Sequence, residues 1–253
     1  MKKSLLFLFS IYGFIFFVLL MLFVFPLVII ASLTGRIKAG NIIYRLITFW
    51  ADAAMFLFIM PHRNINEHLV THDRAQVIVF NHISYIDIPI MLKTLRRFQF
   101  RTLAKAEMGK IPIFGFIYRQ ATVLVDRSSA DARAASMSSM KALIRKKISI
   151  VIAPEGTFNM SNKPLKEFYN GAFKIAIDMQ VPIQPVVFLN GYDRLSYKSI
   201  FSLHPGRSVS VFLPPIATTG MIEEDIERLK QSTFAAMEKE LIVRNVSWIR
   251  NGE

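Results

Sequence analysis

The chain has 253 residues, of which 53% are hydrophobic and none is cysteine, and its formal net charge is +13. The absence of cysteine excludes a thiolate nucleophile, a disulfide framework and a thiolate metal site. A mean hydropathy of +0.37 is too high for an ordinary soluble domain, so we expect part of the chain to contact lipid.

The first segment of the chain is an uncharged apolar run from Ser4 to Ala31. It is longer than the roughly 20 residues that a helix needs to cross the hydrocarbon core of a bilayer. A signal peptide is the alternative, but its apolar region would be only about 7 to 15 residues long and would end at a small-residue cleavage site. We therefore predict a hydrophobic helix that is retained as a membrane anchor.

A second apolar stretch, residues 42–60, is interrupted by polar residues. They recur at the spacing of one face of a helix, and they are Asn41, Arg45, Thr48 and Asp52. Such a helix can lie at the membrane interface, or it can pair with the first helix as a hairpin that turns at residues 34–40.

Basic residues flank both ends of the first apolar run, so the positive-inside rule does not decide its orientation. A hairpin or a monotopic dip would keep both basic ends on the cytoplasmic side, and we favour these arrangements over a full span. The sequence thus predicts membrane-anchoring helices in residues 1–61, located at the cytoplasmic membrane. Residues 62–253 are predicted to form a separate domain that faces the cytoplasm.

The second domain has the pattern of an α/β fold, because short runs rich in Val and Ile alternate with longer helical patterns. The predicted strands are residues 76–80, 100–104, 121–125, 149–153, 183–188 and 208–213. The predicted helices are residues 86–96, 130–146, 170–179 and 222–242.

Positive charge is concentrated between Lys93 and Lys147, where 13 Lys and Arg residues stand against 3 acidic residues. Nucleic acid, an anionic lipid surface and an acidic partner or substrate are the three explanations. We place nucleic acid last, because the chain carries a membrane anchor and none of the common nucleic-acid-binding signatures. Binding to an anionic membrane surface and binding of phosphate are both compatible with this basic segment.

The sequence NHISYID, residues 81–87, places a polar cluster where a buried strand ends and a helix begins. Open α/β sheets bind their ligands at this edge. The same spacing, His-x4-Asp, occurs a second time at His68 and Asp73, but there it lies in a polar stretch that we predict to be a connecting loop. Context therefore selects His82 and Asp87 as the candidate pair.

The start of the predicted helix can be assigned in two ways. Ser84 and Asp87 have the spacing of a capping box, or Asp87 is itself the N-cap, with Pro89 in the first turn. In both cases the positive end of the helix dipole disfavours a protonated His82, so the neutral ring can accept a proton. On a continuous helix the two side chains would point about 140° apart, so the strand-to-helix turn must bring them together.

Motifs that would supply a nucleophile or a phosphate loop are absent from the chain, including GxSxG, the P-loop, GxGxxG and HExxH. A His-Asp pair without its own nucleophile is suited to activating a hydroxyl of the substrate, or water. No cluster of ligand residues suggests a metal ion, and we expect no cofactor.

Four blocks in chain order resemble the glycerolipid acyltransferases typified by 1-acylglycerol-3-phosphate O-acyltransferase. NHISYID is similar to that family's NHxSxxD block. The other three blocks are KAEMGKIPIFGFIYRQATVLVDRSS (105–129), VIAPEGTFN (151–159) and LKEFYNGAFKIAIDMQVPIQPVVF (165–188). The resemblance implies a mixed central sheet flanked by helices, and it implies transfer of an acyl group from acyl carrier protein or coenzyme A to the hydroxyl of lysophosphatidic acid.

The resemblance also implies roles for individual residues. His82 would be the general base and Asp87 would orient it, while backbone N–H groups would stabilise the oxyanion. Lys105 and Arg127 would bind the phosphate of the acceptor. The acceptor site would be lined by Glu155, Gly156 and Thr157.

The chain departs from the family pattern at one position, because Phe158 follows Glu-Gly-Thr where the family has arginine. One phosphate ligand is then missing unless Arg119 or Lys163 replaces it. A lyso-ornithine or lyso-glycine lipid is therefore an alternative acceptor. Hydrolysis of a lysophospholipid and non-catalytic binding of an acidic carrier at the membrane are alternative functions.

Overall fold

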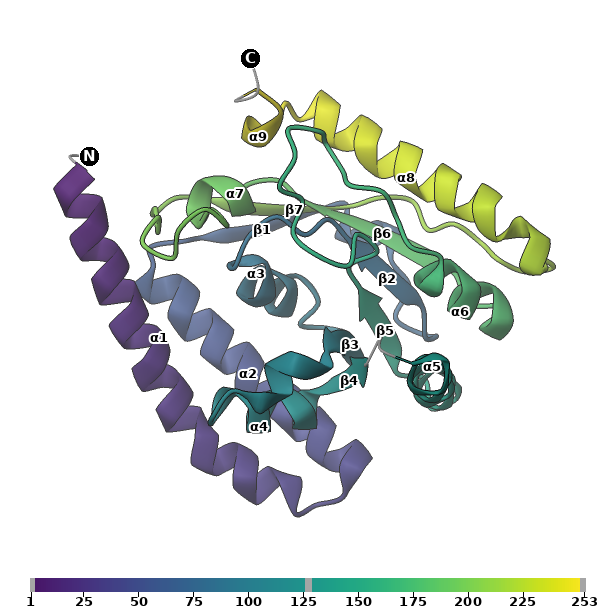
Figure 1. The fold of residues 1–253 in the computed structure, drawn as a ribbon, viewed down its shortest axis with the longest axis horizontal. Coiled ribbons are helices and arrows are strands. Elements are labelled where there is room, and N and C mark those ends of the chain that lie inside the picture. Colours follow the sequence, from purple (N-terminus) through teal and green to yellow (C-terminus); the bar gives the residue numbers. More distant parts are fainter. Residues whose placement is uncertain (1–2, 126–128, 251–253) are drawn as a thin grey trace.

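The computed structural model describes residues 3–125 and 129–250 (Figure 1). Seven strands form one sheet in the order β1-β7-β6-β2-β5-β3-β4. Their bounds are β1 His62–Ile65, β2 Val77–Phe80, β3 Phe100–Lys105, β4 Thr122–Val125, β5 Ser149–Ile152, β6 Ile183–Phe188 and β7 Ser208–Phe212.

The sheet is mixed, as predicted. Strands β2 to β6 are mutually parallel, β7 is antiparallel to β6, and β1 runs parallel to β7. All six predicted strands are present within a residue or two, but β1 was not predicted. Its sequence, HRNI, is mostly polar because it lies at the edge of the sheet, so it lacks the apolar run that marks an inner strand.

Helices cover both faces of the sheet, giving three layers. One face is covered by α1 Lys3–Ser32, α2 Arg36–Leu57, α3 Asp87–Thr94 and α4 Phe114–Ala121. The other is covered by α5 Ala130–Arg145, α6 Gly171–Met179, α8 Ile226–Val243 and α9 Ser247–Arg250. Short elements connect these layers: α7 Gly191–Arg194 and the 3₁₀ helices η1 Glu67–Leu69, η2 Ala106–Lys110 and η3 Glu223–Asp225.

Alternate residues of the inner strands enter two separate cores. In β2, Ile78 and Phe80 belong to the core under α1 to α4, while Val77 and Val79 belong to the core on the opposite face. All four residues are buried, which explains why this strand is a continuous apolar run rather than an alternating one. The four predicted helices correspond to α3, α5, α6 and α8, whereas α4, α7 and α9 were not predicted.

Helices α1 and α2 lie alongside each other, joined by a short turn that ends at Gly35 (Figure 1). Among the described residues, only Ser4–Ser32 of α1 is long and apolar enough to cross a membrane. Many of its large apolar side chains, such as Phe14, Phe23 and Ile30, are exposed on the protein surface.

Two of the four residues in the polar stripe of α2 bind partners in the α/β domain. Asn41 Oδ1 accepts a hydrogen bond from Arg101 Nη2 at 2.9 Å. Asp52 forms ion pairs with Lys93 of α3 (3.0 Å) and with Arg96, which follows α3 (3.2 Å). Two residues of the stripe are therefore explained by contacts within the protein, without lipid headgroups. Helix α2 also shares a hydrophobic core with the sheet, so the division of the chain at residue 61 stays a prediction.

Candidate active site

Five parallel strands place their carboxyl ends at one edge of the sheet. The loops that follow neighbouring strands therefore meet there. His82 follows β2, Glu155 follows β5 and Gly191 follows β6, and these three strands are adjacent in the order β6-β2-β5.

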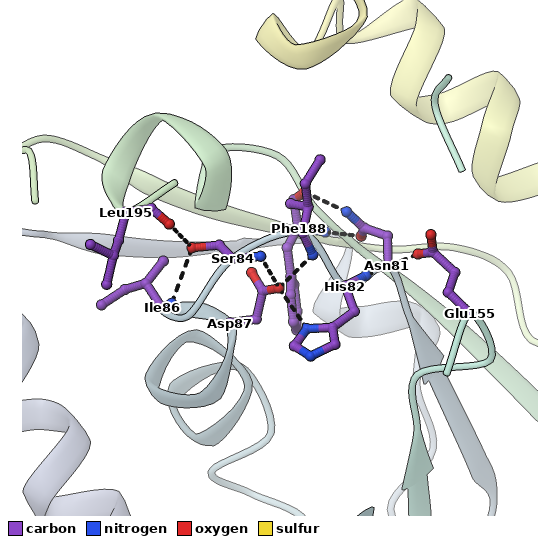
Figure 2. Close-up of polar contacts among 9 residues, drawn as sticks. Asn81, His82, Ser84, Ile86, Asp87, Glu155, Phe188 and Leu195 are labelled. Carbon is purple, nitrogen blue, oxygen red and sulfur yellow. Dashed lines mark hydrogen bonds and ion pairs between the residues drawn. The ribbon is translucent and has the colours of Figure 1, made fainter. Parts of the chain in front are cut away.

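His82 and Asp87 contact each other directly at this edge (Figure 2). His82 Nδ1 lies 2.8 Å from Asp87 Oδ2, and the same oxygen accepts the backbone N–H groups of Ile83 and Ser84, each at 2.8 Å. The Asp87 side chain is fully buried, whereas the side chain of His82 is 21% exposed. A carboxylate held in this way accepts the Nδ1–H of the neutral ring and leaves Nε2 as the basic nitrogen. No residue in the described part of the chain bonds Nε2.

The turn that brings the pair together is built by Ser84. Its backbone N–H bonds Asp87, which is half of the predicted capping box. Its hydroxyl accepts the N–H of Ile86 at 3.1 Å and donates to the carbonyl of Leu195. Because Ser84 is fully buried and its hydroxyl is engaged, it is poorly placed to act as a nucleophile.

Asn81 fixes the start of the same turn, and the sequence analysis did not single it out. Its side-chain oxygen accepts the N–H of Phe188 at 2.7 Å, and its amide group donates to the Phe188 carbonyl at 3.0 Å (Figure 2). These bonds continue the pairing of β2 with β6 beyond the end of β2. His82 is thereby held at a defined position above the sheet.

Gly191 packs against the other oxygen of Asp87. A Cβ atom at position 191 would lie 2.6 Å from Asp87 Oδ1 and 3.2 Å from Ser84 Cβ. Oδ1 is buried and has no hydrogen-bond partner among the described residues. Helix α7 can approach the carboxylate this closely only because residue 191 has no side chain.

Glu155 is buried next to the backbone of His82, so its side chain does not line the surface of the site. Its side chain is fully buried, Oε1 accepts the backbone N–H of His82 at 3.0 Å, and Oε2 accepts that of Lys166 at 2.9 Å. Burial raises the pKa of this carboxyl to about 7, although the two N–H donors act in the opposite direction. The resemblance implied contact with the acceptor, but a carboxylate whose oxygens both bind backbone groups is placed to position His82.

Residues 156–158 form the wall of the site beside His82. Gly156 adopts a φ of 71° and donates its N–H to Ala153, which makes the tight turn after β5. Thr157 Oγ1 accepts a hydrogen bond from Lys166 Nζ at 2.8 Å, a contact that the sequence did not indicate. The ring of Phe158 lies 4.4 Å from the His82 imidazole, measured between ring centroids, so the residue that departs from the family pattern contacts the candidate base.

Of the two predicted phosphate ligands, Lys105 is the one that the structure describes. Lys105 is exposed at the carboxyl end of β3, and β5 separates that strand from β2. Arg127 lies outside the described residues. Arg119 donates to the carbonyl of Gly109 beside α4. Within the described ranges, no group of three His, Asp or Glu side chains could hold a metal ion.

The second His-x4-Asp copy lies apart from this site, in η1 and the loop that follows it. His68 lies in the short 3₁₀ helix η1, within the segment that was predicted to be a connecting loop. The ring of His72 packs 4.4 Å from that of Phe98, measured between ring centroids. Neither histidine reaches the carboxyl edge that carries His82.

Residues 62–189, just over half of the chain, match the family model described as Acyltransferase. The chain belongs to the Acyltransferase family. The resemblance to glycerolipid acyltransferases is thereby confirmed, and the four blocks on which it rested lie within the matched region.

Individual relatives agree with this assignment. An uncharacterized acyltransferase of Schizosaccharomyces pombe is 29% identical over 219 residues, which are 85% of this chain and 78% of that protein. The 1-acyl-sn-glycerol-3-phosphate acyltransferase alpha of Mus musculus is 30% identical over 163 residues, which are 64% of this chain and 56% of that enzyme. As a family member with an apolar N-terminal helix, the protein has the features of a membrane-associated acyltransferase.

The fold is also found in a solved structure. The crystal structure of the 1-acyl-sn-glycerophosphate (LPA) acyltransferase PlsC from Thermotoga maritima superimposes with a TM-score of 0.80. The match covers 98% of this chain and 99% of that chain at 22% sequence identity. The N-terminal helices and the α/β domain are therefore both part of a known acyltransferase fold.

Proposed function

We propose that the protein transfers a fatty acyl group from an acyl thioester to the free hydroxyl of lysophosphatidic acid, giving phosphatidic acid for phospholipid biosynthesis. The observation that carries the proposal is the His82–Asp87 pair, joined at 2.8 Å with Nε2 unpartnered among the described residues. The names of the mouse relative and of the Thermotoga maritima structure favour this acceptor.

His82 acts as the general base in this mechanism. Nε2 takes the proton of the acceptor hydroxyl while the hydroxyl oxygen attacks the thioester carbonyl. Asp87 stabilises the imidazolium that forms, since its Oδ2 faces Nδ1. When the tetrahedral intermediate collapses, the carbon–sulfur bond breaks and the leaving thiolate takes the proton back from His82. The acyl group moves directly between substrates, which agrees with the buried, engaged hydroxyl of Ser84 and with the lack of cysteine.

The developing oxyanion needs donors that the protein does not already use. The N–H groups of His82, Ile83 and Ser84 are all bonded to buried carboxylates. Those of Thr157 and Phe158 have no hydrogen-bond partner within residues 3–125 and 129–250, and the ring of Phe158 packs against the imidazole. We assign stabilisation of the oxyanion to these two groups.

The protein docks on the cytoplasmic face of the membrane, and the acceptor reaches the site from that membrane. The exposed apolar face of α1 would enter the lipid, and the basic segment between Lys93 and Lys147 would face an anionic surface. The donor is acyl carrier protein or an acyl coenzyme A, both of which carry the phosphate groups that a basic surface attracts.

The test is acyl transfer by the detergent-purified protein. Lysophosphatidic acid and a lyso-ornithine lipid would each be offered with acyl carrier protein or coenzyme A thioesters, and transfer would be compared with release of free fatty acid. We expect phosphatidic acid from the wild type, a loss of about 10²- to 10⁴-fold in His82→Ala, and full activity in His68→Ala, which alters the second His-x4-Asp copy. Transfer only to the aminolipid would reassign the acceptor, and release of fatty acid alone would identify a hydrolase.

A further inference from the structure

Lys166 lies in the loop between β5 and α6, close to the candidate base but outside the residues that the sequence indicated. Its side chain is exposed, and Nζ donates to Thr157 Oγ1 at 2.8 Å. Thr157 precedes Phe158, whose ring contacts the imidazole of His82. The ammonium group therefore contacts the wall of the site at Thr157.

Glu155 fixes this arrangement. One carboxylate oxygen holds the backbone N–H of His82 and the other holds the backbone N–H of Lys166. Because a fully buried group joins the two main chains, Lys166 keeps a constant position relative to the base. A long side chain that starts from a fixed backbone loses less freedom when it binds a ligand.

The charge of Lys166 is available to a ligand. Other lysines of the described chain pair with carboxylates, as Lys93, Lys141, Lys174 and Lys230 do. Within the described residues, no carboxylate lies within ion-pair distance of Lys166 Nζ. An ammonium group has three N–H bonds, of which Thr157 takes one, and the Thr157 hydroxyl still has its own proton to donate.

An ammonium and a hydroxyl that converge beside a general base form a site for an anion. In lysophosphatidic acid, only a few covalent bonds separate the reacting hydroxyl from the phosphate, so the phosphate must bind close to His82. The ring of Phe158 occupies the space next to the imidazole, so the cation has to come from a neighbouring position.

We propose that Lys166, together with the Thr157 hydroxyl, binds the phosphate of the acceptor and so sets the preference of the enzyme for a phosphorylated acceptor. This inference rests on the proposed function and names a specificity-determining contact within it.

The test compares kinetic constants for two acceptors that share the reacting hydroxyl. Lysophosphatidic acid carries the phosphate and 1-monoacylglycerol does not. In Lys166→Ala we expect the KM for lysophosphatidic acid to rise about 10- to 100-fold, the effect of losing a charge-assisted bond. The KM for the thioester donor and the rate with 1-monoacylglycerol should stay unchanged, and Lys166→Arg should restore most of the affinity.

A matched control is Lys239→Ala, which removes an exposed lysine from α8 and should behave as the wild type. The proposal is overturned if Lys166→Ala leaves the KM for lysophosphatidic acid unchanged. It is also overturned if the variant weakens both acceptors equally, if it raises the KM of the donor instead, or if Lys163→Ala alone produces the expected effect.

A binding measurement separates this inference from the proposed reaction. The thermal unfolding midpoint of the wild type should rise in a saturable manner with glycerol 3-phosphate, and the rise should be lost in Lys166→Ala. If the wild type acylates no lysophosphatidic acid but shows this Lys166-dependent rise, the proposed function fails and the anion site stands. If both proteins respond equally, or if neither responds, the site is refuted whatever the enzyme acylates.

Discussion

The buried carboxylate of Glu155 and the backbone N–H of His82 are joined by a hydrogen bond of 3.0 Å. Glu155 comes from the turn after β5 and His82 from the turn after β2, so this bond fixes the base relative to the wall of the site. A titratable group that is fully buried and bonds only backbone donors should affect both stability and its dependence on pH.

The first prediction concerns that dependence. Burial raises the pKa of Glu155 from 4.5 to about 7, so the folded protein binds a proton that the unfolded chain releases. This contribution to stability is fully present below pH 4.5 and is lost as pH rises through about 7, with a total of up to about 3 kcal/mol. Glu155→Gln should remove that part of the pH dependence, measured as the free energy of unfolding by denaturant between about pH 4 and pH 8.

Glu167→Gln is the control for this prediction, because Glu167 is an exposed carboxylate in the same loop. Its pH profile should follow that of the wild type. Identical profiles for the wild type and Glu155→Gln would show that Glu155 does not titrate in this range.

The second prediction concerns Asp87, whose Oδ2 contacts His82 Nδ1 and accepts two backbone N–H groups. An asparagine is nearly the same size but carries no charge, so it cannot stabilise the imidazolium and can present an N–H to Nδ1. We expect Asp87→Asn to lower kcat for acyl transfer by about 10²- to 10⁴-fold. Asp73→Asn, which alters the acid of the second His-x4-Asp copy, should retain full activity, and comparable rates for the two variants would argue against the assigned pair.

The third prediction concerns Gly191. A methyl group at this position would lie 2.6 Å from Asp87 Oδ1, so the carboxylate or helix α7 must move. We expect Gly191→Ala to lower the free energy of unfolding by about 1 to 3 kcal/mol, and to reduce kcat more than the KM for the acceptor. Gly171→Ala is the matched control, since a Cβ there meets nothing within 4 Å at the start of α6. If both variants unfold and react alike, the close approach of α7 has no functional consequence.

The core of the sheet and the position of the candidate base were predictable because both depend on local sequence. Apolar runs such as residues 76–80 mark the inner strands, and NHISYID marks the turn that follows one of them. Strand β1 was missed because an edge strand needs no apolar run. Helices α3, α5, α6 and α8 were predicted from their helical patterns, while α4 was missed in a segment that contains Pro112 and Gly115.

The supporting contacts of the site were not predictable, because they join segments far apart in the chain. Asn81 binds Phe188, Glu155 binds His82, and Gly191 faces Asp87. Each of these contacts exists only after β2, β5 and β6 have become neighbours in the sheet. The same reason applies to α2, which was expected to lie at the membrane interface or to pair with α1 as a hairpin. It lies alongside α1, and its polar residues Asn41 and Asp52 bind partners in the α/β domain.

The attachment of α1 to the domain leads to the last prediction. Near its N-terminal end, Phe7 packs on Phe201 with 5.3 Å between ring centroids, and Ser10 Oγ accepts the N–H of Leu203. Near its C-terminal end, Phe25 packs on Phe116 of α4 at 5.8 Å. A helix that contacts the same domain near both of its ends cannot carry one end across a bilayer while the domain stays on one side.

We therefore expect a monotopic arrangement in which the turn between α1 and α2 stays on the same side as the domain. The chain has no cysteine, so Leu33→Cys places a single thiol in that turn, where residue 33 is 82% exposed. In right-side-out membrane vesicles, a membrane-impermeant maleimide should fail to label this thiol, as it should fail to label Lys239→Cys in the domain. In inverted vesicles Lys239→Cys should react. Labelling of Leu33→Cys from the outer face alone would mean that α1 spans the bilayer, and that its contacts with Phe201 and Phe116 must break when the protein enters the membrane.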